Sequence, residues 1–317
     1  MIGTGIGPVY QALTRRSAAG PVLYDFRTGV LPAALSFTRV GAGTRHNASG
    51  QVGNVAADQP RFDHGPDGGA PTALLYEPAA TNFVQYASDP GNNAGWIEST
   101  THNGLTISRI ATGSLGDLAY ADYRVQGTAS SSFTDKFYLS GPSRTAAGPG
   151  QTFTGSAYVQ VIAGSTANIG KFTVSVIEEN AAMGFLGQSI SDWTVDFPQL
   201  TRIVANRTLA DPSAGYVRLA LVLSSMAVGA SIDITLRVAG PQLEEAAAPS
   251  SFVQVPADAA MTRGADRLFL PTYSGERQIT VTFADAGTEV LNSTGLVGGE
   301  LPRFATAEIE TIEAVPL

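Results

Sequence analysis

The sequence predicts an all-β protein whose body is an antiparallel, jelly-roll-like β-sandwich. Short apolar runs recur along the chain between turn residues, and several of them alternate apolar with polar side chains. Glycine supplies 35 of the 317 residues, which suits frequent tight turns. Because no capped helical pattern of ordinary length separates the runs, two packed antiparallel sheets are expected, with small β modules at both ends.

The first 20 residues show neither a helical nor a strand period, and their glycines give them little reason to hold structure alone. A segment of this kind is either disordered or ordered by a partner. The second alternative predicts an anchoring segment over residues 1–20. Its anchors would be the apolar side chains that are costly to leave in water: Ile2, Ile6, Val9, Tyr10 and Leu13.

Residues 21–81 are predicted to form an N-terminal β-hairpin module. Two short strands lie between Val22 and Val40, around a turn that contains glycine and proline. A hairpin follows, in which the turn Pro66 to Gly69 joins Arg61-Phe62 to the apolar run Ala73 to Tyr76. Pro78 ends that run, because proline cannot donate to a sheet ladder.

The hairpin module also contains a predicted structural ion pair. Alternation from Leu35 places Arg39 on the same face of its strand as Phe37, so a buried Arg39 would need a carboxylate. The nearest candidates in the sequence pattern are Glu77 and Asp63, and the arginine could equally be Arg61. The open alternative is that these groups are solvated; a catalytic role is the weakest of the three interpretations.

Residues 82–266 are predicted to form the sandwich. Its strands are expected at Leu105 to Ile110, Leu118 to Val125, Lys136 to Leu139, Phe153 to Ile162, Lys171 to Ile177, Thr201 to Leu209, Tyr216 to Leu223 and Ile232 to Val238. Gly240-Pro241 is expected to end the last of these strands, and a short helix is expected from Gln242 to Ala248, ended by Pro249.

Residues 267–317 are predicted to form a separate small C-terminal β module. Its strands are expected at Arg267 to Tyr273, Gln278 to Phe283 and Ala307 to Ala314. A unit of about 45 residues rarely buries enough apolar surface to be stable alone, so this module needs a partner. Together with the low charge of the chain, this predicts a homo-oligomer.

Two blocks of motifs resemble bacteriophage virion proteins, particularly tail-fibre and head-spike subunits. The first block reads Phe37-Thr38-Arg39, Pro60-Arg61-Phe62-Asp63, Leu74-Leu75-Tyr76-Glu77, Ala80-Thr81-Asn82, Ser88 and Trp96, and the second reads Gly240-Pro241-Gln242-Leu243-Glu244-Glu245, Pro249-Ser250-Ser251-Phe252 and Thr262-Arg263-Gly264-Ala265-Asp266. The chain departs from the family pattern at His46-Asn47-Ala48 and at Phe83-Val84.

The resemblance implies a non-enzymatic structural protein of a phage or phage-like particle, a subunit of a tail fibre, tail tip or head spike. Its partners would be other virion proteins, reached through the N-terminal segment, and the oligomer would be a homotrimer. Its location would be the virion, after synthesis in the cytoplasm of a host bacterium. No charged region precedes the first apolar residues and no run of about 20 apolar residues occurs, so neither a signal peptide nor membrane insertion is expected.

Composition narrows the remaining function classes. The formal net charge is -8 and the only lysines are Lys136 and Lys171, which argues against nucleic-acid binding. Cysteine is absent, which excludes disulfides and thiolate metal sites. Charged residues make up 15% of the chain, below the usual ~25%. Part of the surface therefore faces another protein, or the chain is simply rich in small polar residues.

The sequence contains no recognisable catalytic constellation. His46, His64 and His102 have no metal-ligand partner at a useful spacing, and turn chemistry accounts for His64 without a cation. The acidic doublets Glu178-Glu179 and Glu244-Glu245 cannot each form a glycosidase pair, since adjacent strand residues point to opposite faces. No enzyme activity, cofactor or metal is expected.

The alternative function is a receptor-binding module that grips a cell-surface glycan of the host. Sugar rings stack on flat aromatic side chains beside hydrogen-bonding groups. Candidates near loops or strand ends are Trp96, Tyr138, Trp193 and Asp192. Core packing is the competing interpretation of both tryptophans.

Overall fold

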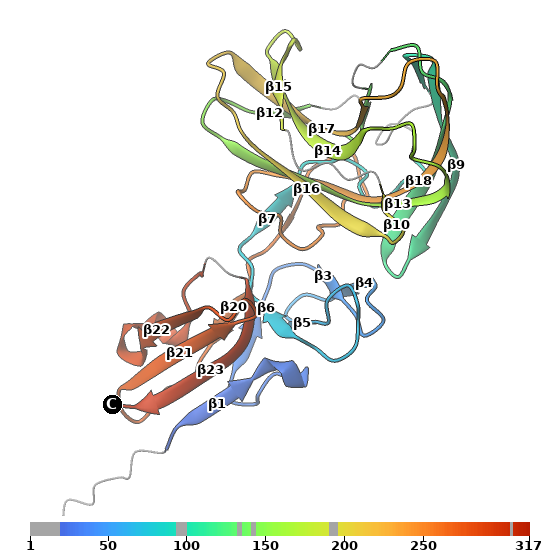
Figure 1. Cartoon of the computed structure of the whole chain (residues 1–317). Helices are drawn as coiled ribbons and strands as arrows, with labels where there is room; N and C mark the ends of the chain where they lie inside the picture. Colours follow the sequence, from blue (N-terminus) through green and yellow to red (C-terminus); the bar gives the residue numbers. More distant parts are fainter. Residues whose placement is uncertain (1–19, 93–99, 132–134, 141–143, 190–195, 305–306) are drawn as a thin grey trace, which may run out of the picture.

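The structure is a computed structural model, and it describes residues 20–92, 100–131, 135–140, 144–189, 196–304 and 307–317. The described chain is almost entirely β, which confirms the predicted fold class. It forms two lobes (Figure 1): a β-sandwich, and a second lobe that contains both ends of the described chain.

The sandwich consists of two antiparallel sheets that enclose the larger core. The first sheet has the order β16 (Thr201–Thr208), β13 (Thr152–Gly164), β18 (Ser231–Glu244), β10 (Leu118–Thr128), β9 (Leu105–Leu115) and β8 (Thr100–His102). The second has the order β11 (Asp135–Tyr138), β17 (Ala214–Ser224), β14 (Lys171–Asn180) and β15 (Phe185–Gln188), with β12 (Thr145–Ala146) also on β17. Alternate residues such as Val174, Leu219, Leu236 and Val238 are fully buried between the sheets. All eight sandwich strands expected from the sequence are present.

The second lobe is built by both ends of the described chain together. Its main sheet has the order β22 (Thr288–Asn292), β21 (Arg277–Phe283), β23 (Glu308–Pro316), β6 (Ala73–Leu75) and β5 (Arg61–Asp63), with β1 (Val22–Asp25) also on β23. The core beneath this sheet combines Phe26, Phe62 and Leu74 from the N-terminal part with Val281 and Ile312 from the C-terminal part.

The expectation of two separate end modules is therefore wrong. β23 pairs with β21 on one side and with β1 and β6 on the other, so neither end has a sheet or a core of its own. The physical reason is size, because fragments of about 50 residues bury too little apolar surface alone. The N-terminal hairpin β5–β6 does form as expected, with Phe62 opposite Leu74.

Three pairs of short strands complete the fold. They are β2 (Ser36–Thr38) with β20 (Arg267–Phe269), β3 (Gly43–His46) with β4 (Val52–Val55), and β7 (Ala80–Asn82) with β19 (Met261–Arg263). Three single-turn 3₁₀ helices, η1 (Phe26–Thr28), η2 (Ser293–Gly295) and η3 (Val297–Gly299), are the only helices of the described residues. None of them is long or apolar enough to cross a membrane.

The expected helix from Gln242 to Ala248 is wrong, because β18 continues through Gly240-Pro241 to Glu244. On the neighbouring β13, Ser156 faces Gln242 and Tyr158 faces Ala239, so Gly240 and Pro241 together stand opposite a single residue. This is a β-bulge, and it accommodates the missing N–H of proline and the positive φ of Gly240 (49°). The strand is redirected here and does not end.

Candidate functional site

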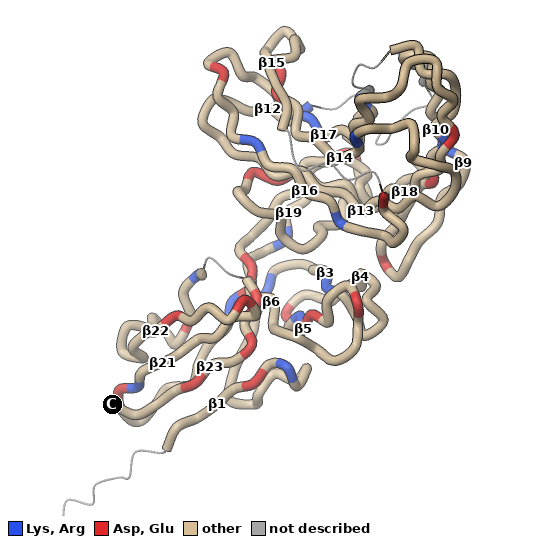
Figure 2. Tube along the Cα trace, in the orientation of Figure 1, with Lys and Arg blue, Asp and Glu red and all other residues tan. Residues whose placement is uncertain are grey.

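The two blocks of motifs meet at the junction between the lobes. β7 (Figure 1) and β19 (Figure 2) run side by side there, and β5, β6 and the start of β20 reach the same place. The side chains that the blocks bring together are all buried: Arg39, Arg61, Glu77, Asn82, Gln242, Glu244, Arg263 and Asp266. Stretches separated by about 160 residues of sequence thus build one site, which we call the junction cluster.

Arg61 lies at the centre of the junction cluster. It extends from β5 and is fully buried, with one nitrogen 2.7 Å from the carboxylate of Glu77 and the same nitrogen bonded to Asp266. Its other terminal nitrogen donates to the Thr44 carbonyl at 3.0 Å and to the Ser251 hydroxyl at 2.5 Å. The guanidinium therefore ties the terminal lobe to the segment that follows β18.

Two further arginines balance the same two carboxylates. Arg263 lies 3.2 Å from Glu77 and 3.6 Å from Asp266, and Arg39 lies 3.3 Å from Asp266. Arg39 also donates to four backbone carbonyls, among them that of Ala56 at 2.6 Å. Buried charges are tolerated when they are paired and hydrogen-bonded in this way.

Glu77 is held in its charged form. Burial alone would raise its pKa, but Arg61, Arg263 and two hydrogen bonds from Ser251 outweigh burial and lower the pKa of Glu77 to about 2. The Ser251 amide donates at 2.7 Å and its hydroxyl at 2.6 Å. The backbone of Glu77 pairs in turn with Asp266, N–H to carboxylate at 2.9 Å and carbonyl to N–H at 2.9 Å.

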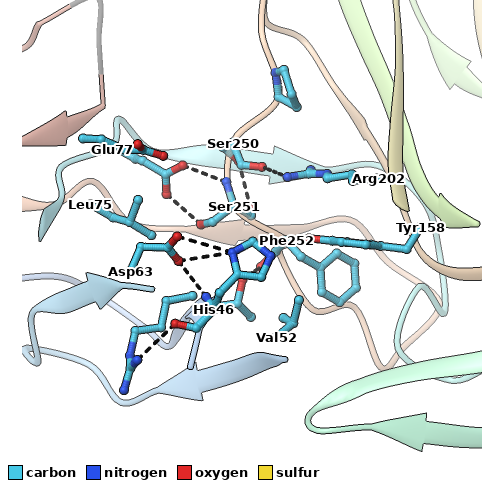
Figure 3. Close-up of a pocket in the computed structure, with 14 residues that line it drawn as sticks. His46, Val52, Asp63, Leu75, Glu77, Tyr158, Arg202, Ser250, Ser251 and Phe252 are labelled. Carbon is cyan, nitrogen blue, oxygen red and sulfur yellow. Dashed lines mark hydrogen bonds and ion pairs between the residues drawn. The ribbon is translucent and has the colours of Figure 1, made fainter. Parts of the chain in front are cut away.

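Of the four residues named for the ion pair, the structure brings Arg61 and Glu77 together. Arg39 pairs with Asp266 instead of Glu77 or Asp63. Asp63 lies apart from the junction cluster and faces His46, whose backbone N–H and ring contact it at 2.6 and 3.3 Å (Figure 3). Burial opposes ionisation of Asp63, yet the bonds from His46 and Gly65 hold its pKa below the ordinary value.

A hydrogen-bond network around Asn82, within the junction cluster, was not predicted from the sequence. The fully buried amide of Asn82 donates to the carbonyls of Pro241 and Val253 at 3.1 and 3.0 Å, and accepts from the N–H groups of Val84 and Leu243 at 3.0 and 3.1 Å. All four hydrogen-bonding capacities of the side chain are used. Only the motif Ala80-Thr81-Asn82 itself could have signalled the role, since asparagine in a strand is otherwise read as a turn residue.

Glu244 completes the network on the sandwich side. It accepts from the amide and hydroxyl of Ser250 at 2.8 and 2.5 Å and from the side chain of Gln242. Burial raises the pKa of Glu244, and the bonds from Ser250 only partly oppose this. Its neighbour Gln242 accepts from the Val253 amide at 2.6 Å.

A small cavity of about 140 Å³ with a mixed polar and apolar lining borders the junction cluster. Figure 3 shows Glu77 facing Ser251 and Asp63 facing His46 at its wall, with Arg202 and Tyr158 reaching in from the sandwich. These polar groups are engaged in hydrogen bonds within the protein: Glu77 with Ser251, Asp63 with His46, and Arg202 with the Ser250 carbonyl. Among the described residues, no group of three or more His, Asp or Glu side chains could hold a metal ion. The chemistry of this arrangement is that of a clamp between two lobes.

The remaining predicted sites are mostly outside the described residues. The anchors Ile2, Ile6, Val9, Tyr10 and Leu13 and the glycan candidates Trp96, Asp192 and Trp193 all lie there. Tyr138 is described, at the end of β11 on the outer face of the second sandwich sheet. The guanidinium of Arg218 stacks on its ring at 3.3 Å, and that arginine lies 3.7 Å from Glu179.

No family model and no curated protein matches the chain. Among solved structures, it is similar to the tripod (BppUct-A-L) of the baseplate of bacteriophage Tuc2009, with a TM-score of 0.40 and 14% identity over 90% of this chain and 99% of that one. It is also similar to an arabinose-bound α-L-arabinofuranosidase, MgGH51 (TM-score 0.30, 14% identity, 65% and 32% covered), and to infectious bursal disease virus of the Gt strain (0.26, 9%, 96% and 82%). All three TM-scores lie below 0.5.

Proposed function

We propose that the chain is a non-enzymatic structural subunit of a phage or phage-like particle, part of a tail fibre, tail tip or head spike. The observation that carries the proposal is the convergence of the two blocks of virion-like motifs on one buried cluster. Glu77, Asp266 and Asn82 hold the lobes together, with Glu77 only 5% exposed and the other two fully buried. Motif residues placed in this way serve the architecture of the protein, as expected for a structural subunit.

The arrangement of the lobes supports attachment through the N-terminal end. Gly20, the first described residue, lies at the terminal lobe, where its carbonyl accepts from Arg277 at 3.0 Å. The C-terminus lies on the same lobe, and the sandwich lies at the other end of the molecule (Figure 1). Anchoring through residues 1–20 would therefore present the sandwich away from the particle. Other virion proteins and two further copies of the chain, in a homotrimer, are the proposed partners.

A chain that starts at Pro21 tests the attachment. We expect it to fold, because β1 begins at Val22 and the core of the terminal lobe is formed by described residues. Circular dichroism should show a β-rich spectrum and a cooperative melt like that of the full chain. Particles assembled with the shortened chain should lack it, as judged by immunoblotting of purified particles. Normal occupancy of the shortened chain would refute attachment through this segment.

A second candidate function is glycan binding by the sandwich. It is favoured by an aromatic and cationic group at the outer face of the β11–β15 sheet, where Lys136 lies 3.6 Å from the ring centre of Phe185 and Arg218 stacks on Tyr138. The Phe185 side chain is 57% exposed, which leaves its ring available to a sugar.

Alanine at Phe185 tests this candidate without disturbing a buried side chain. If the face binds a host surface polysaccharide, calorimetry should show affinity falling on the order of tenfold, the loss of one stacking contact. Alanine at Val228, which is 65% exposed and lies in the loop between β17 and β18, is the control. If the wild-type protein does not bind polysaccharide isolated from the host, glycan binding is refuted as a function of the sandwich.

A further inference from the structure

The outer edge of β22 is open in the terminal lobe. β22 is the last strand of its sheet and pairs only with β21 among the described strands. Its residues Thr288, Glu289, Val290 and Asn292 are exposed, Val290 to 56%. An edge strand normally carries lysine, proline or a bulge that discourages pairing with another strand. Thr288–Asn292 has none of these and a single charge, that of Glu289.

An apolar groove of about 500 Å³ lies beside this edge. Leu291 of β22 contributes to its wall, together with Leu296, Val297, Leu301 and Pro302 from the segment that follows, and the charged Glu300 and Arg303 also line it. Val297 is 89% exposed, the highest value among the large apolar side chains of the described residues. A free strand edge next to an apolar groove is the arrangement that binds an extended peptide, because the edge supplies backbone hydrogen bonds and the groove takes alternate side chains.

We infer that the β22 edge and its groove bind part of the N-terminal segment, residues 1–19, of a second copy of this chain. The segment supplies apolar side chains: Ile2 and Ile6 are four residues apart with small residues between them, so they would lie on one face of an added strand, and Val9 on the other. It also carries Arg15 and Arg16 and no carboxylate, which complements Glu289.

The place where the segment begins brings the β22 edge within its reach. Gly20 lies at one end of the main sheet of the terminal lobe. Across that end, Val22 of β1 pairs with Ala314 of β23, which pairs with Ile279 of β21, which pairs with Leu291 of β22. Three strand spacings, about 14 Å, therefore separate Gly20 from β22, and 19 extended residues span roughly 60 Å. This reach also spans the distance within one chain. We place the exchange between copies because it would join the chains into the homo-oligomer that their low charge predicts.

The inference concerns how copies join and does not depend on which particle they join. β22 has five residues, so pairing uses only part of the segment and leaves the rest for other virion proteins. Each copy gives a strand to the next and receives one, and this head-to-tail contact closes into a ring of three if the rotation between copies allows it.

Cysteine cross-linking tests the exchange, since the chain has no cysteine of its own. Full chains with Val290→Cys are mixed with full chains that carry Ile2→Cys, Ile6→Cys or Val9→Cys, and the mixtures are oxidised. At least one mixture should give on the order of tenfold more disulfide-linked heterodimer than a mixture with Val228→Cys, because pairing raises the effective concentration of the two thiols. Val228 is 65% exposed and lies on the sandwich.

Two further measurements separate the alternatives. Val297→Arg, which places a charge in the groove, should shift the full chain toward monomer in light scattering, while Val228→Arg should not. Chains with both Val290→Cys and a cysteine in the segment report binding within one copy. Cross-links that form only inside such double variants, or no enrichment in any mixture, would overturn the exchange between copies. The particle-incorporation assay is read separately, so either proposal can fail alone.

Discussion

Glu77→Ala is expected to behave as a folding mutant and to lower the free energy of unfolding by about 3–5 kcal/mol. Glu77 is fully enclosed between Arg61 and Arg263 and accepts both hydrogen bonds of Ser251. Its removal leaves two buried guanidinium groups with less compensating charge, which is costly in a low-dielectric interior, and the part-buried amide of Ser251 without its acceptor. Chemical denaturation monitored by circular dichroism measures the effect.

Glu300→Ala is the matched control. Glu300 also pairs with an arginine, Arg267, but that arginine side chain is 52% exposed. Removing an exposed ion pair costs about 0–1 kcal/mol. If Glu77→Ala and Glu300→Ala are equally mild, Glu77 is solvated in the protein and the junction cluster does not hold the lobes together.

The charge of Glu77 should also give stability a specific dependence on pH. Its pKa is about 2 in the folded chain and near 4.5 when unfolded, so its contribution is complete well above pH 4.5 and is lost as the pH falls toward 2. Between pH 7 and pH 3 the expected loss is about 2 kcal/mol. Glu244 has the opposite effect on the pH dependence of stability. Burial raises its pKa, so its contribution to stability is lost as the pH rises.

The pH-dependent contribution of Glu77 is therefore measured as the difference in unfolding free energy between the wild type and Glu77→Gln. Both proteins contain Glu244, so its contribution cancels. The wild type should exceed the variant in unfolding free energy by about 2 kcal/mol more at pH 7 than at pH 3. An equal gap at the two pH values would mean that Glu77 is not held in its charged form.

The strands of the sandwich could be predicted because their pattern is local. Alternation in Lys171–Asn180 and in Ser231–Glu244 reports which side chains face the core. Even the burial of Arg39 follows from its alternation with Phe37. The edge strand β22 was not predicted, because its five residues are mostly exposed and show no apolar face.

The long-range pairings could not be predicted from such patterns. Nothing in the sequence around Val22 specifies that it faces Ala314, and the joint core of the terminal lobe depends on that pairing. Asp266 was likewise missed as the carboxylate for Arg39, since the two are 227 residues apart. The bulge at Gly240-Pro241 was mistaken for a strand end, because glycine and proline occur both at β-bulges and at the ends of strands.

The central claim, that the chain is a structural subunit of a phage-like particle, is tested most directly by locating it on particles. Antibody against the sandwich would be applied to particles purified from cells that carry the gene and imaged by electron microscopy with gold label. The account predicts label at a repeated, symmetric position on a fibre, tail tip or spike, with the sandwich outermost. The account would be contradicted if the particles carried no label and the chain remained in the soluble fraction of the same preparation.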